Sequence, residues 1–129
     1  MANVLTNLGE EWVVDKLMGS GGYTHAGAYV GWGTGAGTAA KADTSLFTES
    51  TDPGSAARVS GTITKAGSGG STSKWQNVAT LSATSTQTIT NAGVFSTTGT
   101  ATMFIKGDFT GIALVSGDSI QFTFTLDPA

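Results

Sequence analysis

The end of the chain alternates strictly between apolar and polar residues. From Ile120 to Leu126, in the sequence IQFTFTL, every second residue is isoleucine, phenylalanine or leucine, and glutamine or threonine lies between them. A period of two is that of a β-strand, because successive side chains of a strand point to opposite faces. A strand with one apolar and one polar face is typical of an antiparallel sheet that is covered on one side. The sequence therefore predicts that earlier strands supply a second layer.

Turn residues divide the preceding part of the chain into further short segments with strand character. Gly61 interrupts the inner face of one of them, and we expect a large neighbour such as Trp32 or Trp75 to fill the gap. The fold class predicted is mainly β, an antiparallel β-sandwich with a jelly-roll-like arrangement of about seven or eight strands. The expected strands cover residues 27–33, 58–65, 74–83, 84–95 with a break at 91–93, 103–106, 112–115 and 120–126. In the segments 74–83 and 84–95, Trp75, Ala79, Leu81 and Ile89 are expected to point inward, and Trp32 is expected to pack in the core as well.

The N-terminal segment has a different period. Its apolar residues recur on one face of a 3.6-residue repeat, which predicts one amphipathic helix from Asn3 to Met18. Gly19 is a suitable C-terminal stop. The helix either packs on its own domain or forms an arm, residues 1–19, that docks on a neighbour, beside a single β-domain of residues 20–129. In the second case the expected partner-binding residues are Leu5, Leu8, Trp12 and Leu17.

Composition excludes several classes of function. At 129 residues the chain has the length of one domain with an appendage. Charged residues make up 12% of it, about half the usual share of roughly 25%. Six Lys and Arg face nine Asp and Glu, so no basic stripe is available for nucleic acid. No apolar run reaches the ~18 residues of a membrane span, and the N-terminus lacks the pattern of a signal peptide. We therefore expect neither nucleic acid nor membrane as a partner.

No catalytic, metal or cofactor site is expected. The chain has no cysteine and one histidine, His25, too few for the usual histidine and thiolate metal sites. No serine stands in a G-x-S-x-G context. The acids Asp43, Glu49 and Asp52 do not have the spacing of a calcium loop and are expected to be solvated loop residues. We predict that the protein is not an enzyme.

The glycine-rich segment 31–37 is not expected to bind phosphate, because the lysine and hydroxyl residue of a P-loop are missing. Its glycines are expected to provide positive φ in a surface loop. Within the same loop, Leu46 and Phe47 are expected to form part of one helical turn and to hold the loop against the body of the domain.

The order of several short motifs resembles that of small structural proteins of tailed bacteriophages. The similarity is to single-domain capsid decoration (cement) proteins and to tail-fibre or collar-like β-domains, and it extends over nearly the whole chain. The motifs are the opening helix followed by GGYT, then AYVGWGTG at 28–35, DTSLFTE at 43–49, RV at 58–59, TITNAGVF at 88–95 and GDSI at 117–120.

This resemblance implies a virion component, made in the bacterial host cytoplasm, that acts without catalysis. The partner implied is the major capsid protein of the same phage, and the protein is expected to be a homo-oligomer, a trimer, on the capsid surface. The alternatives are a tail, neck or fibre component, or a carbohydrate-binding module for host recognition. Such a module would need an exposed aromatic platform.

Overall fold

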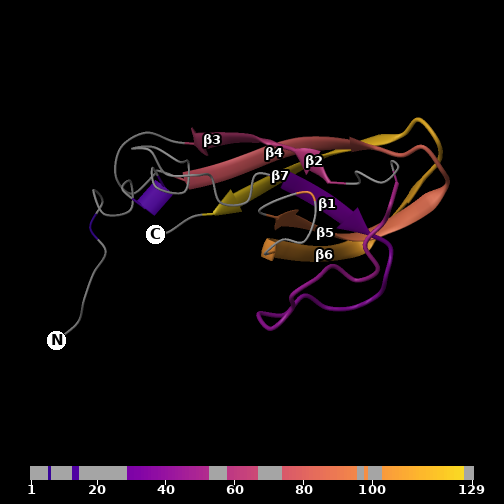
Figure 1. Cartoon of the computed structure of the whole chain (residues 1–129), viewed down its shortest axis with the longest axis horizontal. Helices are drawn as coiled ribbons and strands as arrows, with labels where there is room; N and C mark the ends of the chain where they lie inside the picture. The colour runs from indigo at the N-terminus through magenta and orange to yellow at the C-terminus, as the bar shows by residue number, and fades with distance from the viewer. Residues whose placement is uncertain are drawn as a thin grey trace.

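The described part of the protein is built of two antiparallel sheets and is mainly β (Figure 1). The computed structural model describes residues 6, 13–14, 29–52, 58–66, 74–95, 98 and 103–126. The first sheet has the order β2-β1-β5-β6 and the second the order β3-β4-β7. The strands are β1 (Tyr29–Gly33), β2 (Val59–Ser60), β3 (Thr62–Ala66), β4 (Lys74–Ser82), β5 (Gln87–Phe95), β6 (Met103–Leu114) and β7 (Ser119–Leu126).

Four of these strands form one long hairpin that is folded in the middle. Residues 74–95 pair with residues 103–126, from Trp75 opposite Leu126 in the second sheet to Phe95 opposite Met103 in the first. Both limbs cross between the sheets at the same place, at the right-hand end of Figure 1. The two crossings are bonded to each other, because the amide of Ala83 donates to the carbonyl of Asp118 at 2.7 Å. β1 and β3 extend the first limb on its other side.

The hydrophobic core lies between the two sheets. Trp32 of β1 and Trp75 of β4 are fully buried in it. Trp32 also meets Phe122 of β7 edge-on, with ring centroids 6.4 Å apart, so the contact joins the two sheets. The predicted inward residues of β4 and β5 are confirmed as core residues: Trp75, Ala79, Leu81 and Ile89.

The outer face of the first sheet is buried along β1 and the second half of β5, next to the loop of residues 34–50. Leu46 is buried, which confirms that the loop is held against the domain, although residues 43–49 form turns and not a helical turn. The strand glycines make room for this layer. A Cβ on Gly33 would lie 2.6 Å from the carbonyl oxygen of Phe47. The prediction of positive φ is therefore wrong for Gly33, where close approach of the backbone is what requires glycine.

Two expected interruptions do not exist. Residues 91–93 continue β5 without a break, with a bulge between Ile89 and Asn91, and β6 runs unbroken from Met103 to Leu114 where two short strands were expected. Tertiary pairing overrides the weak strand propensity of these segments. The two halves of the folded hairpin pair with each other along their length. This pairing holds the glycines and polar residues within them in the strand conformation.

The gap at Gly61 exists, but a different residue fills it. Gly61 separates β2 from β3, and a Cβ there would lie 1.6 Å from the Oδ1 atom of Asn77. Asn77 is fully buried. The prediction that a tryptophan occupies this gap is therefore wrong.

Candidate interaction surface

The three loop acids each have a structural partner. Asp43 accepts an ion-paired hydrogen bond from Lys106 of β6, with Nζ and Oδ2 2.8 Å apart. The same ammonium donates to the carbonyl of Ser45 and lies 3.2 Å from the centre of the Phe47 ring. The hydrogen bond from Lys106 holds the pKa of Asp43 below its usual range. The expectation that these acids are simply solvated is wrong, because long-range partners fix them.

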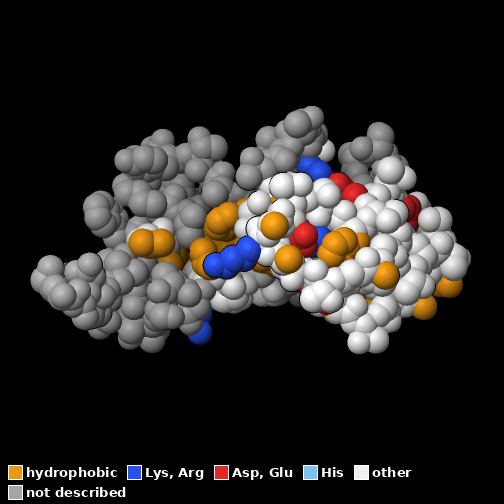
Figure 2. All heavy atoms as spheres, turned by 90° about the horizontal axis from the view of Figure 1, so that it is seen from below, with side chains coloured by type: hydrophobic (Ala, Val, Ile, Leu, Met, Phe, Trp, Pro, Cys, Tyr) orange, Lys and Arg blue, Asp and Glu red, His pale blue; other side chains and the backbone are white. Residues whose placement is uncertain are grey.

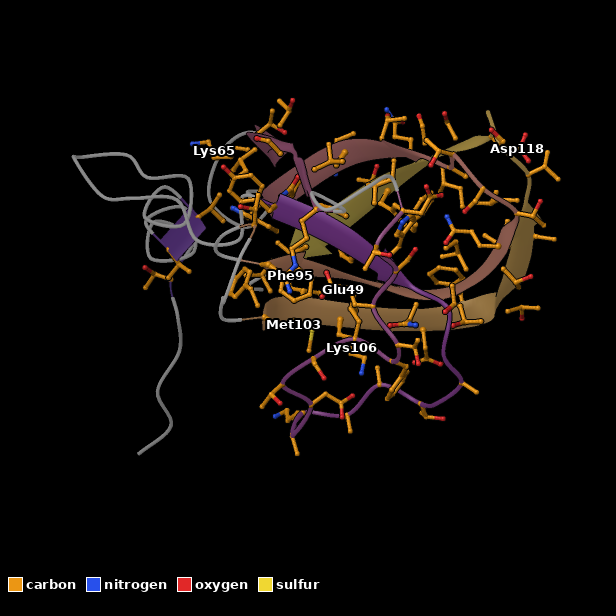
Figure 3. All side chains as sticks on the ribbon, turned by 45° about the vertical axis from the view of Figure 1, so that its right-hand side comes forward. Glu49, Lys65, Phe95, Met103, Lys106 and Asp118 are labelled. Atoms are coloured by element: carbon orange, nitrogen blue, oxygen red, sulfur yellow. The ribbon has the colours of Figure 1, made fainter. Side chains whose placement is uncertain are left out.

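Glu49 forms a two-pronged ion pair with Arg58. The Nε and Nη2 atoms of Arg58 lie 2.8 Å from Oε2 and Oε1 of Glu49, the geometry in which a guanidinium binds a carboxylate best. The guanidinium carbon also lies 3.6 Å from the centre of the Phe95 ring. Figure 3 shows Glu49 and Phe95 beside each other at one end of the first sheet, with Lys106 nearby and Asp118 at the opposite end. The charged side chains of Glu49 and Arg58 are thus paired with each other, and the guanidinium lies against the Phe95 ring.

Asp52 holds the corner at which the folded hairpin turns. Its carboxylate accepts hydrogen bonds from the Thr84 hydroxyl, from the Thr84 amide at 2.8 Å and from Gln87 Nε2 at 2.6 Å. Its backbone carbonyl accepts the indole N–H of Trp32 at 2.7 Å. The Thr84 hydroxyl, followed by the Thr84 and Ser85 amides, lowers the pKa of Asp52, although partial desolvation opposes this.

Acidification should weaken the fold through Asp52. A carboxyl whose pKa is lowered by folding stabilises the protein above its unfolded pKa, here 3.8, and loses that contribution as the pH falls through the folded value. We expect the gap in urea midpoint between the wild type and Asp52→Asn to be larger at pH 6 than at pH 2.5. An equal gap at both pH values would contradict this assignment.

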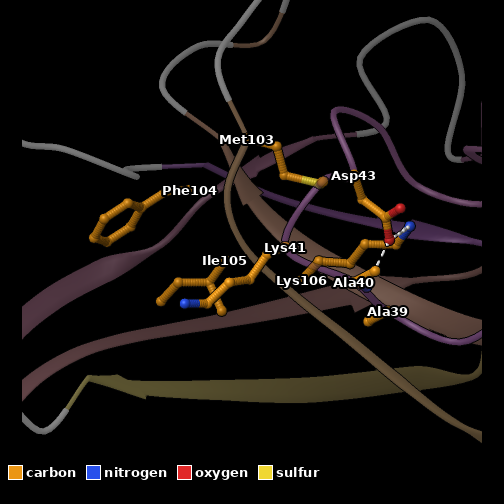
Figure 4. A pocket seen from close by; sticks show the side chains of 8 residues that line it. All are labelled: Ala39, Ala40, Lys41, Asp43, Met103, Phe104, Ile105 and Lys106. Carbon is orange, nitrogen blue, oxygen red and sulfur yellow. Dashed lines mark hydrogen bonds and ion pairs between the residues drawn. The ribbon is translucent and has the colours of Figure 1, made fainter.

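A hollow lies between the 34–50 loop and the start of β6 (Figure 4). Its volume is about 380 Å³, and its floor includes the Asp43–Lys106 pair. Figure 4 shows the Phe104 ring turned away from that pair. The ammonium of Lys106 already has a carboxylate, a carbonyl and an aromatic ring as partners, so it offers neither a free base nor a free anion site. The lining residues are Ala39, Ala40, Lys41, Asp43, Met103, Phe104, Ile105 and Lys106.

Two kinds of site have no support within the described ranges. No group of three histidine, cysteine or acidic side chains lies close enough to hold a metal ion among those residues. Trp32 and Trp75 are both fully buried, which confirms the expected core packing and removes them from any exposed sugar-binding platform.

The predicted partner-binding residues Leu5, Leu8, Trp12 and Leu17 lie outside the described residues, as does His25. Of the predicted helix, Thr6, Val13 and Val14 are described. The backbone is helical at Val13 and Val14 and is not helical at Thr6, so the helix from Asn3 to Met18 is not confirmed. Val14 is fully buried and belongs to the core cluster, whereas the Val13 side chain is 38% exposed. At least one residue of the segment assigned to the arm therefore packs into the β-domain.

One side of the core is less covered than the rest. The apolar side chains of β7 point inward as predicted, but they are only partly buried. The inward side chains of the neighbouring strand β4 are buried. Phe109 and Phe122 are 6.1 Å apart between ring centroids, and Phe122 stacks on Phe124 at 6.3 Å. β6 and β7 are both edge strands, so no further strand of the described residues covers the core on this side. The alternation of β7 predicted the direction of its side chains but not their incomplete cover.

Apolar side chains are also exposed near the crossing from β6 to β7. The exposed fraction is 41% for Ile112 and 56% for Val115, and Phe104 at the other end of β6 is 37% exposed. Figure 2 views the side on which β6 and the 34–50 loop lie, and it shows separate groups of hydrophobic side chains on a surface with few charges. We name Phe104, Ile112 and Val115 the β6 apolar residues. Ile112 and Val115 are close in sequence, whereas Phe104 lies at the opposite end of β6, so the β6 apolar residues are separate exposed points and not one contiguous patch.

Comparison with known proteins adds no identification, because no protein-family model, curated protein or solved structure matches the chain. Within the described ranges, no helix has the length and hydrophobicity needed to cross a membrane.

Proposed function

We propose that the protein is a non-enzymatic structural component of a phage virion, a capsid decoration protein that binds the assembled shell and stabilises it through contacts between subunits. The observation that carries the proposal is the exposure of the β6 apolar residues, which lie outside β7. At about 25 cal/mol per Å² of apolar surface, even a modest contact adds several kcal/mol, and the gain is repeated at each subunit of a shell.

The pairing of the charged side chains within the protein supports the same proposal. Asp43 and Asp52 are engaged with residues far away in the sequence and Glu49 with Arg58, and all three acids serve to fix loops. A rigid, weakly charged surface favours contacts with a protein over chemistry on a small substrate. The phage context comes from the resemblance of the motif order, and the major capsid protein is the partner that this resemblance implies.

The architecture that we propose for this role is a jelly-roll-like β-sandwich with an N-terminal amphipathic helix. The folded hairpin supports it, because a long hairpin bent across two sheets is how a jelly roll is built. The trimer implied by the resemblance stays a prediction.

The test is the copy number of the protein in purified virions of the phage that encodes it, measured by quantitative mass spectrometry against the major capsid protein. We expect a copy number comparable to that of the capsid protein. A value far below it would favour the alternative, a tail, neck or fibre component. Absence from virions would contradict the structural role.

A further inference from the structure

The edges of the two sheets are protected unequally. Natural proteins keep strand edges from pairing with other chains by making them short, charged or covered. Among the described strands the edges are β2, β3, β6 and β7. β2 has two residues, and β3 has five and carries Lys65. β6 carries Lys106 and Asp108, which both bind the 34–50 loop, Asp108 through the Ala39 amide at 2.9 Å.

β7 has none of these protections within the described part of the chain. It is eight residues long, it contains no charged residue, and its only paired strand is β4. In an antiparallel sheet, alternate residues of an edge strand turn their N–H and C=O groups away from the sheet. This edge is therefore a template for another strand, beside an apolar row that is only partly buried.

The sequence of β7 is nearly the same in both directions. Residues 120–126 are IQFTFTL, and the reverse order is LTFTFQI. The centre of this near-palindrome is Thr123. In an antiparallel pair of two copies centred there, Phe122 faces Phe124 of the second copy and Ile120 faces Leu126 of the second copy. Apolar residues then meet apolar residues on the core face, and polar residues meet polar residues on the other face.

We propose that the free edge of β7 pairs with the β7 edge of a second copy of this chain, antiparallel, about a two-fold axis at Thr123. The pairing joins two three-stranded sheets into one sheet of order β3-β4-β7-β7-β4-β3. It extends the cover of the Phe122 and Phe124 rings, which are left partly exposed in one copy.

Self-association fits this edge better than another partner for two reasons. The near-palindrome makes the edge complementary to itself, as a two-fold interface requires. Residues 119–126 carry no charge, so no like charges meet within the paired strands, and Asp118 and Asp127 stand just beyond the two ends of this segment in the sequence. The contact is independent of the proposed virion role. It gives a dimer in place of the trimer that the resemblance implies, because a two-fold contact between β7 edges cannot close a ring of three copies.

The axis position gives a sharp test. The exposed Thr123 faces itself only in this register, so Thr123→Lys places two ammonium groups opposite each other, whereas a single copy merely gains a surface lysine. The matched control is Thr80→Lys, on the exposed face of the central strand β4 of the same sheet. The mass of each full-length variant in solution is measured by light scattering after gel filtration, with circular dichroism as the check on folding.

We expect the wild type and Thr80→Lys to be dimers, and Thr123→Lys to have a dimer Kd raised about tenfold or more. An equimolar mixture of Thr123→Lys and Thr123→Glu should restore the dimer, because opposite charges then meet at the axis. A monomeric or trimeric wild type, an unaffected Thr123→Lys dimer, or a mixture that does not associate would each overturn the proposal. Copy number in virions tests the proposed function separately, so the two can fail independently.

Discussion

Replacing Val14 with aspartate should lower the free energy of unfolding by more than about 4 kcal/mol, because it places a carboxylate with no partner in the hydrophobic core. Val14 is fully buried among residues of both sheets. The neighbouring Val13 is 38% exposed, so Val13→Asp should change the stability by no more than about 0.5 kcal/mol. Urea denaturation followed by far-ultraviolet circular dichroism measures both variants.

This pair of substitutions also decides what the N-terminal segment does. The prediction of an arm at residues 1–19 required that the β-domain be complete without it. A large loss for Val14→Asp with little loss for Val13→Asp would show that the segment is part of the core. Equal stability of the two variants would support the alternative, in which residues 1–19 form an independent arm.

Replacing Asn91 with aspartate should destabilise the protein by about 3–5 kcal/mol at pH 7. Asn91 is fully buried and binds the backbone of Phe47 twice. Its Oδ1 accepts the Phe47 N–H at 3.0 Å, and its Nδ2 donates to the Phe47 carbonyl at 3.1 Å. A carboxylate keeps the first bond, loses the second, and brings a negative charge against a carbonyl oxygen. One of the attachments of the 34–50 loop to β5 would then be lost.

The loss at Asn91 should depend on pH. Burial and the facing carbonyl raise the pKa of the introduced carboxyl, and the protonated form can again donate to Phe47. The destabilisation is therefore complete above the raised folded pKa and becomes smaller as the pH falls through it. Asn91→Ala is the control, because it removes both bonds without adding a titrating group. A loss for Asn91→Asp that follows Asn91→Ala at every pH would refute this account.

The contrast between β7 and Asn91 indicates what the sequence alone can predict. The direction of the β7 side chains follows from a period of two, which is a local property, and the inward residues of β4 and β5 were predicted in the same way. The role of Asn91 depends on Phe47, 44 positions earlier in the chain. No local pattern distinguishes an amide that binds a distant backbone from one in a surface turn.

The same reasoning explains the errors at the charged residues and at β6. Asp43 finds Lys106 across 63 positions, so it was predicted to be solvated. Two short strands were expected at residues 103–106 and 112–115, but the partner strand β5 decides whether an edge strand continues. The partial exposure of Phe122 and Phe124 depends on which strands lie at the edges of the sheets. The alternation of residues within one strand does not predict the order of strands in a sheet.

The folded hairpin has a consequence for how fast the chain can fold. Its pairs form a nested series, beginning with Phe95 opposite Met103 and ending with Trp75 opposite Leu126. Each pair encloses the one before it, so the limbs can zip from the inside outward, and each step adds little loop-closure entropy. β1 and β3 can dock once the first limb is in place. The chain therefore has a route to a mainly β structure whose early steps join near neighbours, although its final contact order is high.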